Sequence, residues 1–110
     1  MQIDLRKDQD VVIAEPHGDV DGKTASDFQQ QIIELLLPQA RIVIDFSGIA
    51  FMSSTGLRTM LLIYRQAKTS GVRLALANVN KDIRASMSAT GFLSFFLVLD
   101  SVQASVDAVR

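Results

Sequence analysis

The chain has 110 residues, a length typical of one domain with one hydrophobic core. Hydrophobic residues make up 48% of it and charged residues 21%, a balance that excludes an intrinsically disordered protein. The formal net charge is −1 and the 11 Lys and Arg residues are scattered, so we expect no nucleic-acid partner.

Two short strands are predicted first. Apolar and polar residues alternate over residues 2–6, as in a strand with one solvent-exposed face. A polar turn at 8–10 separates this strand from the β-rich run 11–14, so we expect an antiparallel hairpin. Pro16 and Gly18 then break the chain, which places the region around them in a loop.

From about Thr24 the apolar residues recur every three or four positions, which predicts a helix. Thr24 or Ser26 can cap its start, and Pro38 ends it because proline disfavours helical geometry in the residue before it. The apolar face of this helix is expected to carry Ala25, Phe28, Ile32, Leu35 and Leu36.

The run 41–46 is nearly all apolar and rich in β-branched residues, which is typical of a central strand covered on both faces. A turn at 47–48 and a second apolar stretch at 49–52 follow it. Residues 53–56 then open a second helix, which the sequence Ser70-Gly71 ends. Its expected inner face is Leu57, Met60 or Leu61, Tyr64 and Ala67.

The alternating run 72–77 predicts another strand. A short helix begins at about Asn80 and is closed by Gly91, and an edge strand is expected at 96–99. An amphipathic helix starts at Ser101. The whole chain is therefore expected to be one α/β domain, with a mixed four- to five-stranded sheet flanked by about four helices.

The absence of cysteine excludes disulfides and thiolate catalysis, and it favours a reducing compartment. The longest apolar run, near 95–99, is far shorter than the ~20 residues that cross a bilayer. The N-terminal residues 1–8 have no apolar signal core. We therefore expect a cytoplasmic protein without membrane insertion.

Residues that could support an enzymatic or metal site are few. The single histidine, His17, stands in an expected loop, and no Gly-x-Ser-x-Gly elbow is present, so a serine hydrolase is a remote alternative. Asp19 and Asp21 lack further ligands at metal-binding spacing and are better explained as helix-capping carboxylates. The glycines form no phosphate-binding loop. We expect no catalytic residue, no metal and no cofactor.

The hydroxyl cluster Ser53-Ser54-Thr55 precedes Gly56 at the predicted start of a helix. One interpretation is helix capping, a routine role of serine and threonine. The other is phosphorylation, because the N–H groups and dipole at a helix N-terminus accommodate a phosphate of about −2 charge. The spacing alone leaves both interpretations open.

Residues 45–57, DFSGIAFMSSTGL, resemble the signature segment of the STAS domains of bacterial anti-sigma-factor antagonists. The family pattern is Asp-Leu-Ser-Gly, four apolar or small residues, then Asp-Ser-Ser/Thr-Gly-Leu. The sequence Gly-Asp-Val-Asp at 18–21 resembles the family's Gly-Glu-Leu-Asp, and residues 71–79 resemble its fourth strand. The resemblance covers essentially residues 1–110.

The resemblance implies a phosphorylation-gated switch between partners. It assigns the phosphate acceptor to Ser54, with Thr55 as the runner-up. The implied partners are a serine kinase that is also an anti-sigma factor, and a PP2C-type phosphatase that reverses the modification. The chain departs from the family at Ser53, where the archetype has aspartate, and this removes a charge beside the acceptor.

The contact surface for the partner is expected around the acceptor and the loop 18–22. The residues predicted to bind the partner are Asp19, Asp21, Met52, Ser53, Thr55, Gly56, Leu57 and Arg58. Core packing is the alternative for Met52 and Leu57, and a solvated side chain is the alternative for Arg58. A transporter-associated STAS subunit that docks on an ABC ATPase without phosphorylation is the main functional alternative. We expect a monomer or a weak dimer.

Overall fold

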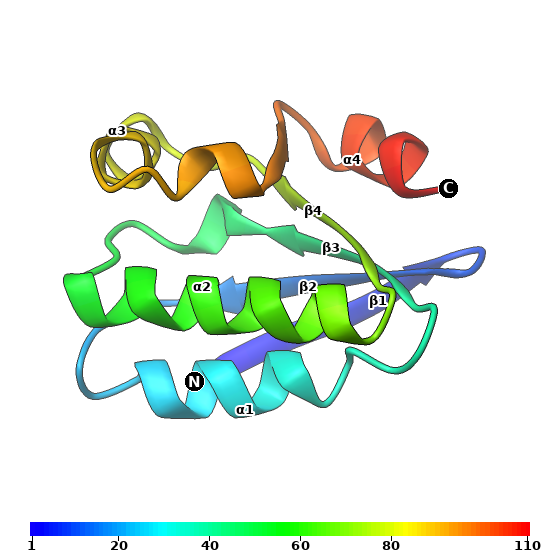
Figure 1. Ribbon diagram of the computed structural model, residues 1–110, viewed down its shortest axis with the longest axis horizontal. Helices are drawn as coiled ribbons and strands as arrows, with labels where there is room; N and C mark the ends of the chain where they lie inside the picture. The colour runs from blue at the N-terminus through cyan, green and yellow to red at the C-terminus, as the bar shows by residue number, and fades with distance from the viewer.

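A five-stranded mixed sheet runs through the centre of the computed structural model, which describes residues 1–110 (Figure 1). The strands are β1 (Gln2–Asp8), β2 (Val11–His17), β3 (Arg41–Asp45), β4 (Arg73–Ala77) and β5 (Leu97–Leu99). They follow one another across the sheet in sequence order. The first two form an antiparallel hairpin, and the later neighbours pair in parallel. The predicted fold class is therefore confirmed.

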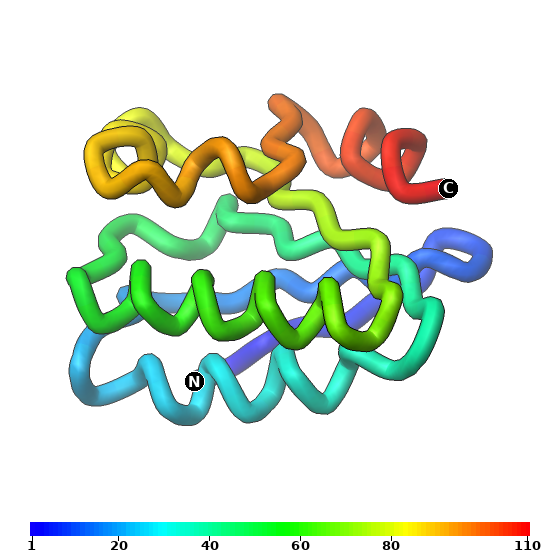
Figure 2. The backbone as a smooth tube through the Cα atoms, viewed as in Figure 1, coloured from blue at the N-terminus to red at the C-terminus, as the bar shows by residue number.

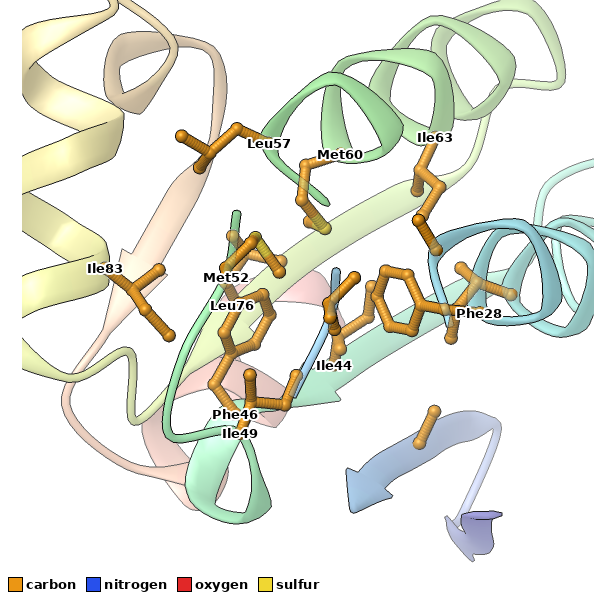
Figure 3. Close-up of a cluster of buried hydrophobic side chains, with 14 of the residues drawn as sticks. Phe28, Ile44, Phe46, Ile49, Met52, Leu57, Met60, Ile63, Leu76 and Ile83 are labelled. Atoms are coloured by element: carbon orange, nitrogen blue, oxygen red, sulfur yellow. The ribbon is translucent and has the colours of Figure 1, made fainter. Parts of the chain in front are cut away.

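Four α-helices cover the sheet: α1 (Ala25–Ile33), α2 (Ser54–Thr69), α3 (Lys81–Ala89) and α4 (Val102–Val109). Helices α1 and α2 lie side by side on one face, and α4 packs on the other face against β3 and β4 (Figures 1 and 2). Helix α3 lies above the N-terminal part of α2 in Figure 1, and its Ile83 lies on the side of Met52 and Leu57 (Figure 3). None of these helices combines the length and hydropathy that crossing a membrane requires.

The core has two parts because β3 is covered on both faces, as its composition predicts. Ile42 and Ile44 belong to a cluster of 18 buried residues under α1 and α2. Val43 points the other way and belongs to a second cluster of 7 buried residues, which includes Val106 and Val109 of α4. Because successive side chains of a strand point to opposite faces, β3 contributes to both clusters. Phe28, Ile44 and Met60 meet inside the larger cluster (Figure 3).

The first helix is shorter than the apolar spacing predicts. It ends at Ile33 rather than at Pro38, so Leu35 and Leu36 lie beyond it. The N–H groups of these two leucines bond to the carbonyls three residues earlier, at 2.9 and 3.0 Å. Such tightening into 3₁₀ geometry is common at a helix end. Leu36 nevertheless remains in the core.

Three further details differ from the sequence-based expectation. In α2 the buried residue of the alternative pair is Met60, and Ile63 rather than Tyr64 completes the buried face. The edge strand β5 begins at Leu97, because a 3₁₀ turn (η2, Leu93–Phe95) occupies the residues before it. His17 is the last residue of β2, not part of a loop, and its Nε2 lies 2.9 Å from an Asp4 carboxylate oxygen across the hairpin.

Candidate functional site

The site begins at the carboxyl end of β3, where Asp45 organises the turn that follows. One oxygen of its buried carboxylate accepts hydrogen bonds from the Ser47 N–H at 3.0 Å and the Ser47 hydroxyl at 2.6 Å. The same oxygen accepts from the Asn78 side-chain amide at 3.0 Å. These bonds fix the 3₁₀ turn Phe46–Gly48 (η1) and tie the end of β3 to the end of β4.

Burial acts to raise the pKa of the Asp45 carboxyl, because it disfavours the charged form. The hydrogen bonds from Ser47 and Asn78 outweigh burial and hold this pKa below its ordinary value of 3.8. Asp45 is therefore an ionised carboxylate, and the three hydrogen bonds that one of its oxygens accepts hold the turn together. This structural role explains the aspartate at the start of the signature segment.

After the turn, the chain extends the sheet by a single parallel bridge between Val20 and Met52. The Val20 N–H donates to the Phe51 carbonyl at 3.0 Å, and the Ser53 N–H donates to the Val20 carbonyl at 2.9 Å. The Gly18 N–H donates to the Gly48 carbonyl at 3.0 Å. The apolar stretch 49–52 is thus no regular strand, but it holds the loop 18–22 directly alongside the start of α2.

Gly56 allows α2 to begin this close to the bridge. A Cβ atom at this buried position would lie 2.6 Å from the Met52 Cγ and 2.7 Å from the Val20 carbonyl oxygen. Such distances are far inside van der Waals contact, and the carbonyl belongs to a hydrogen-bonded backbone that cannot rotate away. The glycine of the signature segment is therefore required by close approach, not by an unusual φ.

The three hydroxyls at the start of α2 have different roles. Ser53 is the N-cap, and its side-chain oxygen accepts from the Gly56 N–H at 3.2 Å. Ser54 and Thr55 are exposed, and neither hydroxyl forms a hydrogen bond within the chain. One capping hydroxyl and two free hydroxyls therefore coexist in one turn. Serine caps a helix as well as aspartate does, so the departure from the family at Ser53 keeps the cap and removes only the charge.

The loop beside this turn contains Asp19 and Asp21, and the two carboxylates have different roles in the structure. The Asp21 carboxylate accepts the backbone N–H groups of Lys23 at 2.9 Å and Thr24 at 3.3 Å, so it caps the turn that leads into α1. Thr24 occupies the N-cap position but makes no capping bond. Its hydroxyl donates instead to the Asp19 carbonyl at 2.7 Å. The Asp19 side chain is exposed and free of such a task.

The remaining predicted contact residues divide between core and surface. Met52 and Leu57 are 5% and 7% exposed and belong to the large hydrophobic cluster, so they support the turn from beneath. Arg58 is exposed one helical turn after Ser54, and no carboxylate lies in salt-bridge range of it. The exposed groups of this turn and of the neighbouring loop are therefore one carboxylate, one guanidinium and two free hydroxyls.

Phe51 is a surface residue that the sequence did not single out. It is apolar yet 54% exposed, and it stands at the rim of a shallow hollow between the stretch 49–52 and α3. The hollow has a volume of about 240 Å³ and is lined by Ala50, Phe51, Met52, Asp82, Ile83 and Ser86. Phe51 thus adds one exposed apolar side chain to the surface near the hydroxyls.

Asn80 fixes α3 against this face. Its side-chain oxygen accepts from the Ile83 N–H at 2.9 Å, which caps α3. Its side-chain nitrogen donates to the Ala50 carbonyl at 3.0 Å. One amide thus sets where α3 begins and how it meets the stretch that leads to Ser54. A capping residue is recognisable from sequence, whereas its second bond depends on the fold.

Comparison with known proteins adds the family context. The STAS domain family model matches residues 2–108. A protein of Bordetella bronchiseptica, named "Putative anti-sigma factor antagonist BtrV", is 27% identical over 111 residues, which cover 100% of this chain and 96% of that protein.

Solved structures share the fold at lower identity. An anti-sigma factor antagonist from Mycobacterium paratuberculosis has a TM-score of 0.87 at 21% identity, covering 99% of this chain and 93% of its own. Unphosphorylated SpoIIAA, an anti-sigma factor antagonist, has a TM-score of 0.78 at 20% identity, covering 99% and 96%. Bacillus SpoIIAA has also been solved in a phosphorylated form. The murine anion transporter Slc26a9 contains a similar domain, with a TM-score of 0.79 at 18% identity, covering 88% of this chain and 17% of the transporter.

Proposed function

The chain belongs to the STAS domain family, and on that premise we propose that it is an anti-sigma-factor antagonist controlled by phosphorylation of Ser54. The unphosphorylated protein binds a serine kinase that is also an anti-sigma factor, and it thereby frees the sigma factor. Phosphorylation by this kinase dissociates the pair, and a PP2C-type phosphatase restores the binding form. The protein itself performs no catalysis and works in the cytoplasm.

The free hydroxyl of Ser54 is the observation that supports this proposal most strongly. It is exposed at the first residue of a 16-residue helix, while its neighbour Ser53 provides the cap. A kinase can therefore modify Ser54 without removing a hydrogen bond that the fold needs. The Ser53 oxygen already accepts from the Gly56 N–H and is less exposed than Ser54, which makes Ser53 the less accessible acceptor.

The effect of the phosphate falls on the partner rather than on the fold. A doubly charged group at a helix N-terminus is locally favourable by about 0.3–1 kcal/mol. The domain should therefore remain folded. A partner that covers Ser54 must instead desolvate the phosphate and bring its own carboxylates near it. Losing tenfold in affinity requires only about 1.4 kcal/mol, which one such charge supplies.

The partner surface that we propose consists of exposed groups around the acceptor. Arg58 lies one helical turn after Ser54, Asp19 belongs to the loop beside the start of α2, and Phe51 provides an apolar group at the hollow beside α3. Aromatic and arginine side chains are the residues that most often dominate binding energy in protein interfaces. Met52, Leu57 and Gly56 contribute indirectly, by holding the turn in place.

The direct test is to incubate the protein with ATP and the serine kinase encoded nearest to it, and to read the intact mass and the modified position. We expect one phosphate, on Ser54. It should be lost in Ser54→Ala and kept in Ser53→Asp and Thr55→Ala. A phosphate that remains on Ser54→Ala, or one that maps to Thr55, would contradict the assignment. An unmodified protein that copurifies with an ABC ATPase would support the transporter alternative instead.

A further inference from the structure

The outer edge of β1 is a long, open strand edge. β1 has 7 residues and pairs only with β2, whereas the opposite edge strand, β5, has 3 residues. An open edge presents unpaired N–H and C=O groups to any strand that fits. Proteins usually discourage such pairing with charges, and β1 carries several. The arrangement of those charges therefore decides whether a second strand is excluded or accepted.

The hairpin turn determines which backbone groups of β1 face outward. Asp8 and Val11 lie opposite each other across a two-residue turn, so this pair closes the hairpin with hydrogen bonds. Hydrogen-bonded and non-bonded pairs alternate along an antiparallel ladder. The even-numbered residues of β1 therefore bond to β2. The N–H and C=O groups of Ile3, Leu5 and Lys7 point away from the sheet.

The side chains of β1 offer complementary groups at this edge. Asp4 and Arg6 have side chains that are 58% and 53% exposed, on the sheet face where they contact His17 and Glu15 of β2. Leu5 points to the other face and is 57% exposed. It lines a hollow of about 350 Å³ together with Val12, Leu35 and the charged residues Arg6 and Lys7. An apolar side chain thus stands at the centre of the strand, with opposite charges on either side.

We propose that this edge pairs with the same edge of a second copy of the chain, antiparallel and centred on Leu5. The two sheets then form one continuous sheet across a two-fold axis. In this register Leu5 faces Leu5 of the other copy, each Asp4 faces the other copy's Arg6, and all seven residues of β1 find an opposing residue. Oppositely charged pairs directly across an antiparallel ladder are stabilising.

The two neighbouring two-fold registers, centred on Asp4 or on Arg6, place like charges opposite each other. Centring on Asp4 places two carboxylates opposite each other, and centring on Arg6 places two guanidiniums opposite each other and Asp4 against Asp8. Like charges directly opposite are destabilising. The charge pattern therefore selects the single register that uses the full strand. No residue of the proposed partner surface lies on β1, so the dimer presents two copies of that surface.

Cysteine cross-linking of the full-length protein tests the register directly, because the native chain contains no cysteine. In a hydrogen-bonded antiparallel pair the Cα atoms lie about 5.5 Å apart, within the range that a disulfide spans. Leu5→Cys should therefore form a disulfide-linked dimer under mild oxidation. Lys7→Cys is the matched control on the same strand and face. Its counterpart lies four residues along the ladder, about 14 Å away, and should not cross-link.

Sedimentation equilibrium of cysteine-free protein provides the second readout. The wild type should approach twice 12.1 kDa as its concentration rises. Asp4→Arg and Arg6→Asp should each weaken the dimer roughly tenfold, because two attractive pairs become repulsive. The double variant should recover most of the loss, whereas Arg65→Asp on α2 should have no effect. A wild type that stays at 12.1 kDa up to about 1 mM would overturn the proposal, and so would equal cross-linking of Leu5→Cys and Lys7→Cys.

Discussion

Replacing Gly56 by alanine should destabilise the protein even though alanine favours helices. The added Cβ would lie 2.6 Å from the Met52 Cγ and 2.7 Å from the Val20 carbonyl oxygen. The Met52 side chain can move, but the Val20 carbonyl is held by the Ser53 N–H at 2.9 Å. Relieving such overpacking costs about 1–3 kcal/mol, and the helix preference of alanine returns up to about 1 kcal/mol. We expect a net loss of about 1 kcal/mol.

Urea unfolding of Gly56→Ala, followed by circular dichroism, measures this loss. Gly22→Ala is the matched control, because no atom lies within 4 Å of a Cβ at Gly22 and its φ is not in the left-handed region. At position 22 alanine should stabilise the folded protein by about 0.4–1 kcal/mol, because it lowers the conformational entropy of the unfolded chain. The two glycines should thus differ in the sign of their effect. A Gly56→Ala protein as stable as Gly22→Ala would refute the argument from close approach.

Three further predictions concern single hydrogen-bonding side chains, each measured by urea unfolding. Ser53→Ala should lose about 1 kcal/mol of stability with the cap of α2, whereas Ser53→Asp should lose nothing, and an equal loss in both would contradict the capping role. Asp45→Asn should cost about 1.5 kcal/mol at pH 7, because its ionised carboxylate accepts three hydrogen bonds. The folded pKa of Asp45 lies below 3.8, so this gap should shrink as the pH falls below that value, and a gap independent of pH would be inconsistent with it. Asn80→Ala should lose about 2 kcal/mol, since Asn80 caps α3 and also bonds to the Ala50 carbonyl, while Asn80→Asp should recover the capping part alone.

Local patterns predicted most of the fold because its elements are locally consistent. The nearly continuous apolar run of β3 reflects burial on both faces. The alternating sequence of β4 was enough to predict a strand, although its last three residues are also buried on both faces. Helix starts were predicted where a capping residue precedes an apolar period, as at Asn80 and Ser101. The predicted end of α1 was wrong. Leu35 and Leu36 continue the apolar spacing of the helix, although their N–H groups already make the 3₁₀ bonds that follow its end.

The sequence predicted that residues 53–56 open a helix, and the structure confirms this. Local capping rules explained the hydroxyls of this turn without assigning each to a role. Which hydroxyl caps and which is free depends on the exact first residue of α2. The close approach of Gly56 to Val20 and the bond from Asn78 to Asp45 join residues more than thirty positions apart. Such contacts appear only once the chain is folded.

The measurement that tests the central claim most directly is the affinity of the proposed kinase partner for this protein before and after phosphorylation of Ser54. Isothermal titration with the phosphorylated form, the unmodified form and Ser54→Ala gives the three values. We predict that the phosphate weakens binding at least tenfold, or about 1.4 kcal/mol, and that Ser54→Ala binds like the unmodified protein. All three proteins should keep the same circular dichroism spectrum. Equal affinity of the phosphorylated and unmodified forms would contradict the switch.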